Sequence, residues 1–367
     1  MNKKTYHIIT IGCQMNKSDS ERVASVLEKQ GYRWTGNKYR SDLVVVNTCG
    51  VRQSAEDRVY GLVPRIKKEN KKAKIMVTGC LVNRGDVRRR LKKYVDAWLP
   101  IVKISNFQFP ISNKCPNPND QLKCKNYLDI EPIYQSKFSV FVPIGNGCNN
   151  FCSYCVVPYA RGRETYRPVK DILAEVRGLV RKGYKEITLI AQNVNSYKSR
   201  NSQLATRNSK IIDFADLLKM VNNIPGDFQI KFITSHPKDM SDKLIKTMAK
   251  CKKVSREIHL PAQSGDNEIL KKMNRQYTAG HYKKIIKKIL KLMPDAKIST
   301  DIIVGFPGES KKQFNNTIKL FKEIKFSQAY IARYSSRPGT AAYKLADDVT
   351  PAEKKRRWLA LNSLICR

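Results

Sequence analysis

Hydrophobic and polar positions follow two periods along the chain, one typical of strands and one typical of helices, and the two periods alternate. In the N-terminal part, short apolar runs rich in β-forming residues predict strands at 6–11, 43–46 and 74–78. Amphipathic stretches predict helices at 18–30, 53–68 and 84–93. Strand and helix in this succession indicate a small parallel sheet covered by helices. We therefore expect an N-terminal α/β domain over residues 1–102.

The next segment, residues 103–137, breaks this pattern. Its four prolines stand among asparagine, lysine and glutamine residues, a composition typical of loops. We expect a linker between two domains, with room for one edge strand. The linker also holds Cys115 and Cys124, which we take as incidental free thiols.

The alternation of strand and helix patterns resumes at residue 138. Apolar runs predict strands at 138–142, 186–191, 229–234, 257–260, 297–304 and 329–334. Amphipathic stretches between them predict helices, for example at 169–182, 213–221, 241–252 and 310–325. Six β/α units in succession favour a partial (β/α)6 barrel over a doubly wound sheet. We expect this barrel over residues 138–345 and a C-terminal helical extension over 346–367.

Charge is the most biased property of the composition. The 367 residues include 70 Lys and Arg against 31 Asp and Glu, a formal net charge of +39. Such an excess favours a polyanionic partner such as nucleic acid, because phosphates release counterions when basic side chains bind them. The alternative is that the lysines only solvate helix faces, as the run at 67–72 suggests.

Hydropathy and cysteine use indicate the compartment. No apolar stretch is long enough to span a membrane, and the apolar run near the N-terminus is too short for a signal peptide. Ten cysteines at clustered spacings fit metal-ligating thiolates in a reducing cytosol better than a disulfide scaffold. We expect a soluble, cytoplasmic protein.

Cys148, Cys152 and Cys155 form the densest cysteine cluster, a C-x3-C-x2-C triplet. Three thiolates on one short loop can hold three irons of a four-iron cluster and leave the fourth iron without a protein ligand. A zinc site would need a fourth nearby ligand, whereas the loop offers only amides and a hydroxyl. The loop follows the first strand of the predicted barrel, at the end where active sites form. A chance group of buried or zinc-binding cysteines is the alternative.

A second set, Cys13, Cys49 and Cys80, is spread over the N-terminal domain. Each of these cysteines follows a predicted strand within three residues, and parallel strands end at one edge of their sheet, where ligands collect. The three thiols could therefore converge on a second iron–sulfur cluster, with Gly12 and Gly79 allowing tight turns beside it. The alternative is that they are small buried residues at strand ends. Spacing alone does not decide between the two.

Several further stretches accompany the two cysteine sets. They are Gly12–Asn16, Asn47–Arg52, Gly79–Cys80, Gly147–Gly162, Gln192–Tyr197, Thr234–Pro237, His259–Gly265, Asp301–Glu309 and Tyr334–Thr340. In this order they resemble the methylthiotransferases of the radical S-adenosylmethionine (SAM) superfamily, and the resemblance covers nearly all of residues 5–345. It favours the iron–sulfur interpretation of both cysteine sets.

The resemblance implies two 4Fe–4S clusters with different tasks, and it makes all six cysteines catalytic as well as metal-ligating. The cluster on the 148–155 triplet would bind SAM and pass it one electron. The resulting 5′-deoxyadenosyl radical would take the hydrogen from C-2 of an adenine ring. The cluster on the N-terminal set would present sulfur, and a second SAM would supply the methyl group.

Further contacts to SAM are expected at the mouth of the barrel, from side chains at the C-terminal ends of its strands. The candidates are Gln192, Asn193, Ser235, Gln263 and Asp301. Each of them could instead be a structural cap. Tyr154, between two of the cysteines, could stack on the adenine of SAM or pack in the core.

Three other side chains lie close to these motifs. Arg161 and Arg163 follow the cysteine triplet and could contact phosphate or be solvated. His236, before a proline, is as good a candidate for a structural histidine as for a functional one.

Within the family, Gln14, Met15 and Asn16 resemble the branch that methylthiolates N6-isopentenyladenosine (dimethylallyladenosine) beside the tRNA anticodon. The ribosomal-protein branch usually has Pro-Lys-Asn there, and the threonylcarbamoyladenosine branch commonly has Lys or a related residue. The implied partners are the anticodon stem-loop of tRNA and a reducing electron donor, and we expect a monomer. The alternatives are a methylthiotransferase for threonylcarbamoyladenosine or a ribosomal-protein aspartate, and a structural cysteine-rich RNA-binding protein without enzymatic activity.

The C-terminus departs from the family pattern. The family normally continues into a small all-β RNA-binding domain, whereas this chain stops at Arg367. We expect either a fragment or a protein that binds RNA without that domain. The sequence leaves the roles of Cys251 and Cys366 open, together with those of the two linker cysteines.

Overall fold

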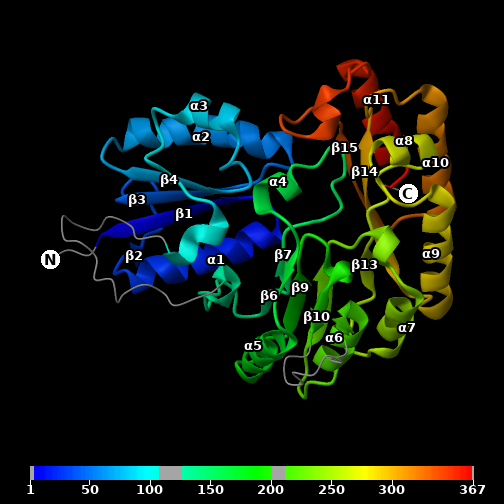
Figure 1. Cartoon of the computed structure of the whole chain (residues 1–367), viewed down its shortest axis with the longest axis horizontal. Coiled ribbons are helices and arrows are strands. Elements are labelled where there is room, and N and C mark those ends of the chain that lie inside the picture. Colours follow the sequence, from blue (N-terminus) through cyan, green and yellow to red (C-terminus); the bar gives the residue numbers. More distant parts are fainter. Residues whose placement is uncertain (1–3, 107–125, 201–210, 366–367) are drawn as a thin grey trace. The chain divides into compact units, whose positions relative to one another are not determined.

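The computed structural model describes residues 4–106, 126–200 and 211–365, and it divides into two units (Figure 1). The units consist of Met1–Lys137 with Tyr159–Gly162, and of Phe138–Pro158 with Arg163–Arg367. Both are mixed α/β, which confirms the predicted fold class.

The first unit is built on a parallel sheet in which the described strands stand in the order β2-β1-β3-β4-β5. Its strands are β1 (Thr5–Ile11), β2 (Arg33–Trp34), β3 (Leu43–Thr48), β4 (Lys74–Gly79) and β5 (Ala97–Trp98). The sequence predicted the three central strands and missed the two short edge strands. In the register of the sheet, Ile11 pairs with Thr48, and Thr48 pairs with Gly79. The three central strands therefore end level with one another.

Helices cover both faces of this sheet (Figure 1). They are α1 (Gln14–Lys29) on one face and α2 (Gln53–Glu69) and α3 (Gly85–Leu91) on the other. In β3, Val45 packs with Leu27 of α1, while Val44 and Val46 pack with Val59 of α2. The strand reads as a continuous apolar run because both of its faces are covered.

The second unit contains the six predicted strands of a partial barrel, all parallel to their neighbours. They are β6 (Ser139–Pro143), β9 (Glu186–Ile190), β12 (Gln229–Ile233), β13 (Glu257–His259), β14 (Lys297–Val304) and β15 (Gln328–Arg333). Hydrogen bonds join them into the ladders β12-β9-β6 and β13-β14-β15. A bridge between Ile230 and Val254 continues the parallel pairing from β12 to the segment that leads into β13.

Amphipathic helices surround the barrel strands (Figure 1). They are α5 (Val169–Arg181), α6 (Phe214–Asn222), α7 (Asp242–Lys250), α8 (Asn267–Lys272), α9 (Ala279–Leu292), α10 (Lys311–Ile324) and α11 (Pro351–Asn362). Side-chain oxygens of Asp213, Ser241 and Ser310 cap the starts of α6, α7 and α10, which is why these helices begin close to the predicted positions. Within the described residues, no helix is long and apolar enough to cross a membrane.

Short elements frame the loops of the second unit. They are β7 (Gly145–Asn146), α4 (Val157–Arg161), β8 (Thr165–Tyr166), β10 (Lys198–Arg200) and β11 (Ile211–Asp213). β7 pairs with β8 and β10 with β11, both antiparallel. The sequence predicted none of them, because two- or three-residue strands and a one-turn helix leave no periodic pattern.

The described ends of the predicted linker contain the 3-10 helices η1 (Ile101–Asn106) and η3 (Tyr127–Asp129). The edge strand that we expected is absent from those ends. Residues 107–125, with Cys115 and Cys124, lie outside the described part of the chain, as does Cys366.

Candidate metal centres

The three cysteines of the first unit follow the level ends of β1, β3 and β4. Cys49 and Cys80 are each 5% exposed, whereas Cys13 reaches solvent. Burial and, after it, the charges of Cys80 and Cys13 raise the pKa of the Cys49 thiol to about 11. The level strand ends put the three cysteines at one edge of the sheet. The structure thus brings together residues that are far apart in the sequence.

A buried network of polar groups fixes the loops that carry these thiols. The side-chain oxygen of Asn16 accepts from the Cys13 backbone N–H at 3.2 Å. Its amide group donates to Asn47 Oδ1 at 2.9 Å and to the Thr48 carbonyl at 3.2 Å. The same carbonyl accepts from the Cys80 N–H at 2.8 Å. One asparagine and one carbonyl therefore connect all three loops.

The two glycines of these loops are required by that network. A Cβ on Gly12 would collide with the side chain of Asn16. A Cβ on Gly79 would collide with the Thr48 carbonyl, and the φ of Gly79 is +88°. The left-handed backbone at Gly79 forms the tight turn that we expected there. The close approach at both positions is to protein atoms.

The network also explains why α1 begins earlier than predicted. We expected the helix from residue 18, but it begins at Gln14, with Cys13 as the N-cap residue. Asn16, at the third helical position, closes a capping box with Cys13 and takes the place of the usual Glu or Gln. The first helical turn has Met15 as its one apolar residue, so the hydrophobic period did not reveal it.

In the second unit, the triplet loop lies between β7 and β8. Cys148 is 9% exposed, and burial raises the pKa of its thiol to about 11, so that a metal would have to displace a proton at neutral pH. The Cys155 N–H donates to the Cys152 carbonyl at 2.9 Å, which closes the turn between them. The Gly147 N–H donates to Gln192 Oε1 at 2.6 Å and ties the loop to the end of β9.

Two residues after α8 hold the triplet loop, and the sequence did not single out either of them. The Asn274 amide donates to the Phe151 carbonyl at 3.0 Å. Arg275 is 8% exposed, and its Nη1 lies 3.4 Å from the Cys152 sulfur. The positions in this last contact are 123 residues apart, so no local spacing could have indicated it.

Three of the predicted SAM contacts share an uncommon feature. Each has a buried oxygen without a hydrogen-bond partner among the described residues, namely Asn193 Oδ1, Ser235 Oγ and Gln263 Oε1. Folded proteins rarely leave buried polar atoms unpaired, so such atoms indicate a missing ligand. The backbone is left-handed at Thr234 (φ 74°) and at Gln263 (φ 65°), and such strain collects at functional sites. These residues fit a polar cosubstrate.

Gln192 and Asp301 differ from those three. The side-chain oxygen of Gln192 is occupied by the Gly147 N–H, which gives this residue a structural role. Asp301 lies inside β14, so our placement of it at a strand end was wrong. Its carboxylate lies 3.4 Å from His259 Nε2. Contact of either residue with SAM stays a prediction.

Tyr154 and His236 have the surroundings of structural residues. Tyr154 packs against the cluster that contains Met273 and Phe306, and its contact with SAM stays a prediction. His236 is 4% exposed, and its Nδ1 accepts from the Lys238 N–H at 3.2 Å. Burial, helped by nearby positive charge, lowers the pKa of His236 to about 2, so the ring is neutral at physiological pH.

The two arginines after the triplet are also resolved. The guanidinium of Arg163 lies 4.6 Å from the centre of the Phe151 ring. Arg161 is neither solvated nor available to phosphate, because it is buried and paired with Asp19 at 2.6 Å. The sequence gave no sign of this pair, which joins positions 142 residues apart.

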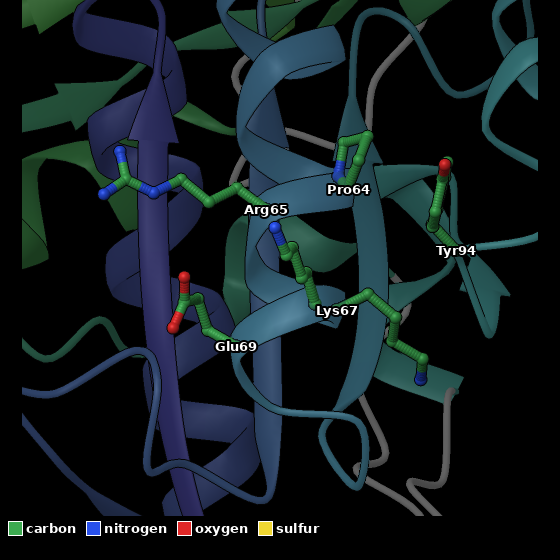
Figure 2. Close-up of a pocket in the computed structure, with 6 residues that line it drawn as sticks. Pro64, Arg65, Lys67, Glu69 and Tyr94 are labelled. Carbon is green, nitrogen blue, oxygen red and sulfur yellow. The ribbon is translucent and has the colours of Figure 1, made fainter.

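A surface hollow at the C-terminal end of α2 is lined by Pro64, Arg65, Lys67, Lys68, Glu69 and Tyr94 (Figure 2). It contains no cysteine, and Lys67 is bound to Asp96 at 3.1 Å. Cys49 precedes the opposite end of the same helix. This hollow is therefore separate from the cysteine site of the first unit. Across the described part of the chain, no three His, Cys, Asp or Glu side chains are grouped to hold a single metal ion.

Comparison with known proteins gives two family matches. Residues 142–321 match the model of the radical SAM superfamily, and residues 5–99 match that of the uncharacterized protein family UPF0004. The chain is 43% identical over 371 residues to the tRNA-2-methylthio-N(6)-dimethylallyladenosine synthase of Clostridium botulinum strain Langeland, covering 98% of this chain and 81% of the relative. The enzyme of that name from Thermoanaerobacter sp. strain X514 is 44% identical, with 96% and 76% covered.

Solved structures share the fold. The cobalamin-dependent SAM radical enzyme OxsB matches with a TM-score of 0.60 at 10% identity, covering 99% of this chain and 56% of its own. The radical SAM methyltransferase TsrM from Kitasatospora setae, with cobalamin and a [4Fe-4S] cluster bound, matches with a TM-score of 0.57 at 12% identity, covering 93% and 77%. At such low identities these matches show the fold alone.

Proposed function

Since the chain belongs to the radical SAM methylthiotransferase family, we propose that it converts N6-isopentenyladenosine beside the tRNA anticodon to its 2-methylthio derivative. The observation that carries this proposal is the 43% identity, over 98% of the chain, to a tRNA-2-methylthio-N(6)-dimethylallyladenosine synthase. A net charge of +39 suits a tRNA substrate.

The protein uses two 4Fe–4S clusters and SAM as cofactors. When bound, they supply one-electron cleavage of SAM, a sulfur atom and a methyl group. We assign the SAM-binding cluster to Cys148, Cys152 and Cys155. We assign the second, auxiliary cluster to Cys13, Cys49 and Cys80. The chemistry of the ligands supports both assignments, since each set offers three thiols on loops that hydrogen bonds hold in place.

The residues around the triplet hold it in place before any cofactor binds. Gln192 and Asn274 bind backbone groups of the loop, and Arg275 donates to the Cys152 sulfur. This fixed arrangement removes the ordering cost from cofactor binding. Arg275 also places its positive charge 3.4 Å from the Cys152 sulfur.

The unpaired oxygens of Asn193, Ser235 and Gln263 are the groups that we assign to SAM. Each oxygen can accept a hydrogen bond from the amino group or a hydroxyl of the cosubstrate. Buried acceptors of this kind discriminate strongly, because an incorrect ligand leaves them unpaired. They would orient SAM in the barrel and exclude water.

The assignment to the tRNA branch of the family, rather than to the ribosomal-protein branch, depends on the helical turn after Cys13. Met15 is 3% exposed and Asn16 is fully buried. In the ribosomal-protein pattern, a lysine would take the place of Met15 and bring a charge into this interior. The packing of Met15 therefore favours the tRNA branch over that alternative.

The finer parts of the proposal concern organisation and partners. We propose an N-terminal auxiliary-cluster domain over 1–102, a linker over 103–137, the barrel over 138–345 and a C-terminal extension over 346–367. The anticodon stem-loop is the proposed contact region of tRNA. We further propose a monomeric, cytoplasmic enzyme that takes its electrons from a reducing donor.

The test is a turnover assay with the anaerobically reconstituted protein. Its substrate is tRNA from a strain that makes isopentenyladenosine but cannot methylthiolate it, and the nucleosides are measured by mass spectrometry. We expect 2-methylthio-N6-isopentenyladenosine, and no product from tRNA that lacks the isopentenyl group. A methylthio product only on threonylcarbamoyladenosine would move the protein to the other tRNA branch. SAM cleavage without any tRNA product would reject the proposal.

A further inference from the structure

Arg275 is a buried arginine of the second unit whose guanidinium reaches the triplet loop. It follows α8 in the chain and is 8% exposed. Its Nε donates to the Tyr277 hydroxyl at 2.9 Å, and its Nη2 donates to the Pro261 carbonyl at 3.1 Å. Its Nη1 donates to the Cys152 sulfur at 3.4 Å. Three hydrogen bonds therefore fix the orientation of the guanidinium, and one of them ends on a candidate metal ligand.

These contacts give the charge of Arg275 no carboxylate partner. Buried charges in folded proteins are normally paired. Arg357 in the same unit is an example, because it is 3% exposed and its Nη1 donates to the Glu309 carboxylate at 2.7 Å. In the part of the chain that the structure describes, no carboxylate is paired with Arg275. Cys152, which is a thiolate whenever it binds a metal, is therefore the contact that can supply the negative charge.

We propose that Arg275 raises the reduction potential of the SAM-binding cluster through its hydrogen bond to the Cys152 sulfur. This inference rests on the proposed assignment of that cluster to Cys148, Cys152 and Cys155. A four-iron cluster on three thiolates is anionic, and reduction by one electron adds a further negative charge. A hydrogen bond to a ligand sulfur and a positive charge in a site of low dielectric constant both favour the reduced form. Arg275 acts through a ligand and is thus a positioning residue.

A purely structural role for Arg275 predicts a shift of the opposite sign. If Arg275 only fastened the triplet loop, its loss would loosen the loop and admit water to the cluster. Water stabilises the more highly charged, reduced form, so the potential would rise. In our proposal, loss of the hydrogen bond and of the positive charge destabilises the reduced form, so the potential falls. The sign of the shift therefore separates the two roles.

The experiment uses the full chain with Cys13, Cys49 and Cys80 replaced by Ala, so that only the SAM-binding cluster assembles. Its potential is measured by redox titration followed by electron paramagnetic resonance. We expect Arg275→Gln to lower the potential by about 59 mV, a tenfold change for a one-electron couple. Arg275→Lys keeps the positive charge and should restore part of the lost potential. An unchanged or raised potential in Arg275→Gln at full iron content would overturn the proposal.

Asn274 and Arg163 provide matched controls on the same loop. The Asn274 amide donates to the Phe151 carbonyl at 3.0 Å, and its φ of 55° suits glycine. Asn274→Gly should loosen the loop without lowering the potential. Arg163 is exposed, with its guanidinium 4.6 Å from the centre of the Phe151 ring. Arg163→Gln removes the same charge where solvent screens it, so its shift should be much smaller. Equal shifts in Arg163→Gln and Arg275→Gln would overturn the proposal.

A second measurement covers the case in which Arg275→Gln does not fold, because it leaves Arg275 in place. The parent protein is made with arginine that carries the heavy nitrogen isotope, and pulsed electron paramagnetic resonance of the reduced cluster detects nitrogen nuclei bonded to its ligands. We expect a coupling to arginine nitrogen that persists in Arg163→Gln. Absence of this coupling would overturn the role of Arg275. Absence of any cluster in the parent triple-cysteine protein would overturn the proposed ligand assignment instead.

Discussion

The two cysteine sites obtain three thiols in opposite ways. The site of the second unit takes them from one loop and depends on distant residues, such as Asn274 and Arg275, to hold that loop. The site of the first unit takes one thiol from each of three strand ends, and a hydrogen-bond network around Asn16 connects these strand ends. A local sequence motif therefore identifies the candidate metal ligands but not the residues that hold their loop. A site assembled from distant residues can be identified only from the fold.

Each unit contains a buried arginine, but the two arginines have different partners. Arg275 donates directly to the Cys152 sulfur at 3.4 Å. Arg161 is paired with Asp19 at 2.6 Å. Three predictions test how the two units differ.

Removal of one cysteine from each site should give the largest effect. Cys148→Ala should abolish 5′-deoxyadenosine formation, while Cys13→Ala should preserve SAM cleavage and stop methylthiolation. Each variant should hold about four irons per chain in place of about eight. Chromatography of the nucleoside products and iron analysis measure both.

The control for this prediction is Cys251→Ala. Cys251 is 4% exposed at the end of α7 and belongs to neither site. Its replacement should leave iron content and both reactions unchanged. A methylthiolated product from Cys13→Ala would contradict the division of labour between the sites.

A change of pH should destabilise the barrel through His236. Burial lowers the pKa of His236 to about 2 in the folded protein. In the unfolded chain the ring binds a proton near pH 6.5, whereas in the folded chain it stays neutral at that pH. The contribution of His236 is therefore present above pH 6.5, and it falls by about 1.4 kcal/mol for each pH unit below. Between pH 7 and pH 5 the loss should reach about 2 kcal/mol. Hydrogen exchange of peptides from the second unit measures it.

His236→Asn is the matched variant, because an asparagine oxygen can still accept from the Lys238 N–H. It should remove the part of the pH dependence that His236 causes and keep the turn. The same slope in both proteins would show that another group titrates. Peptides of the first unit should not respond to the substitution.

A smaller effect is expected from two serines of the second unit. Ser235→Ala removes a buried hydroxyl without a hydrogen-bond partner among the described residues, so the stability of the protein should stay the same or rise. SAM should bind about tenfold more weakly, a loss of about 1.4 kcal/mol. Calorimetric titration with SAM and thermal unfolding give the two values.

Ser241 has the opposite role and supplies the comparison. Its hydroxyl caps α7 by accepting from the Leu244 N–H at 3.1 Å. Ser241→Ala should therefore cost about 1 kcal/mol of stability and leave SAM affinity unchanged. If Ser235→Ala behaved like Ser241→Ala, Ser235 would be a structural cap.

Periodicity predicted the fold where elements are long. The central strands and the amphipathic helices agree with the structure because each buries a regular face. The edge strand β2 is exposed and β5 only half-buried, and the first turn of α1 has no apolar period, so these were missed. Their positions depend on pairing with distant strands and on a capping side chain.

The sites were predicted unevenly for a similar reason. Cysteine spacing and strand ends nominated all six thiols, and three strand-end residues proved to have unpaired oxygens. Arg161 and Arg275 could not be nominated, because each acts across more than a hundred positions. Asp301 was wrongly placed at a strand end, because a strand pattern in the sequence does not show which residues of the strand lie near the ligand.

The chain returns to the first unit at Tyr159–Gly162, and this return limits how the gene can be divided. No single cut in the gene separates the two units. A product that ended at Lys137 would lack Arg161 and leave the Asp19 carboxylate without its cation. An uncompensated interior charge costs about 3–5 kcal/mol, a large part of what holds a domain folded. Replacement of one unit by a foreign counterpart without a matching arginine would meet this penalty.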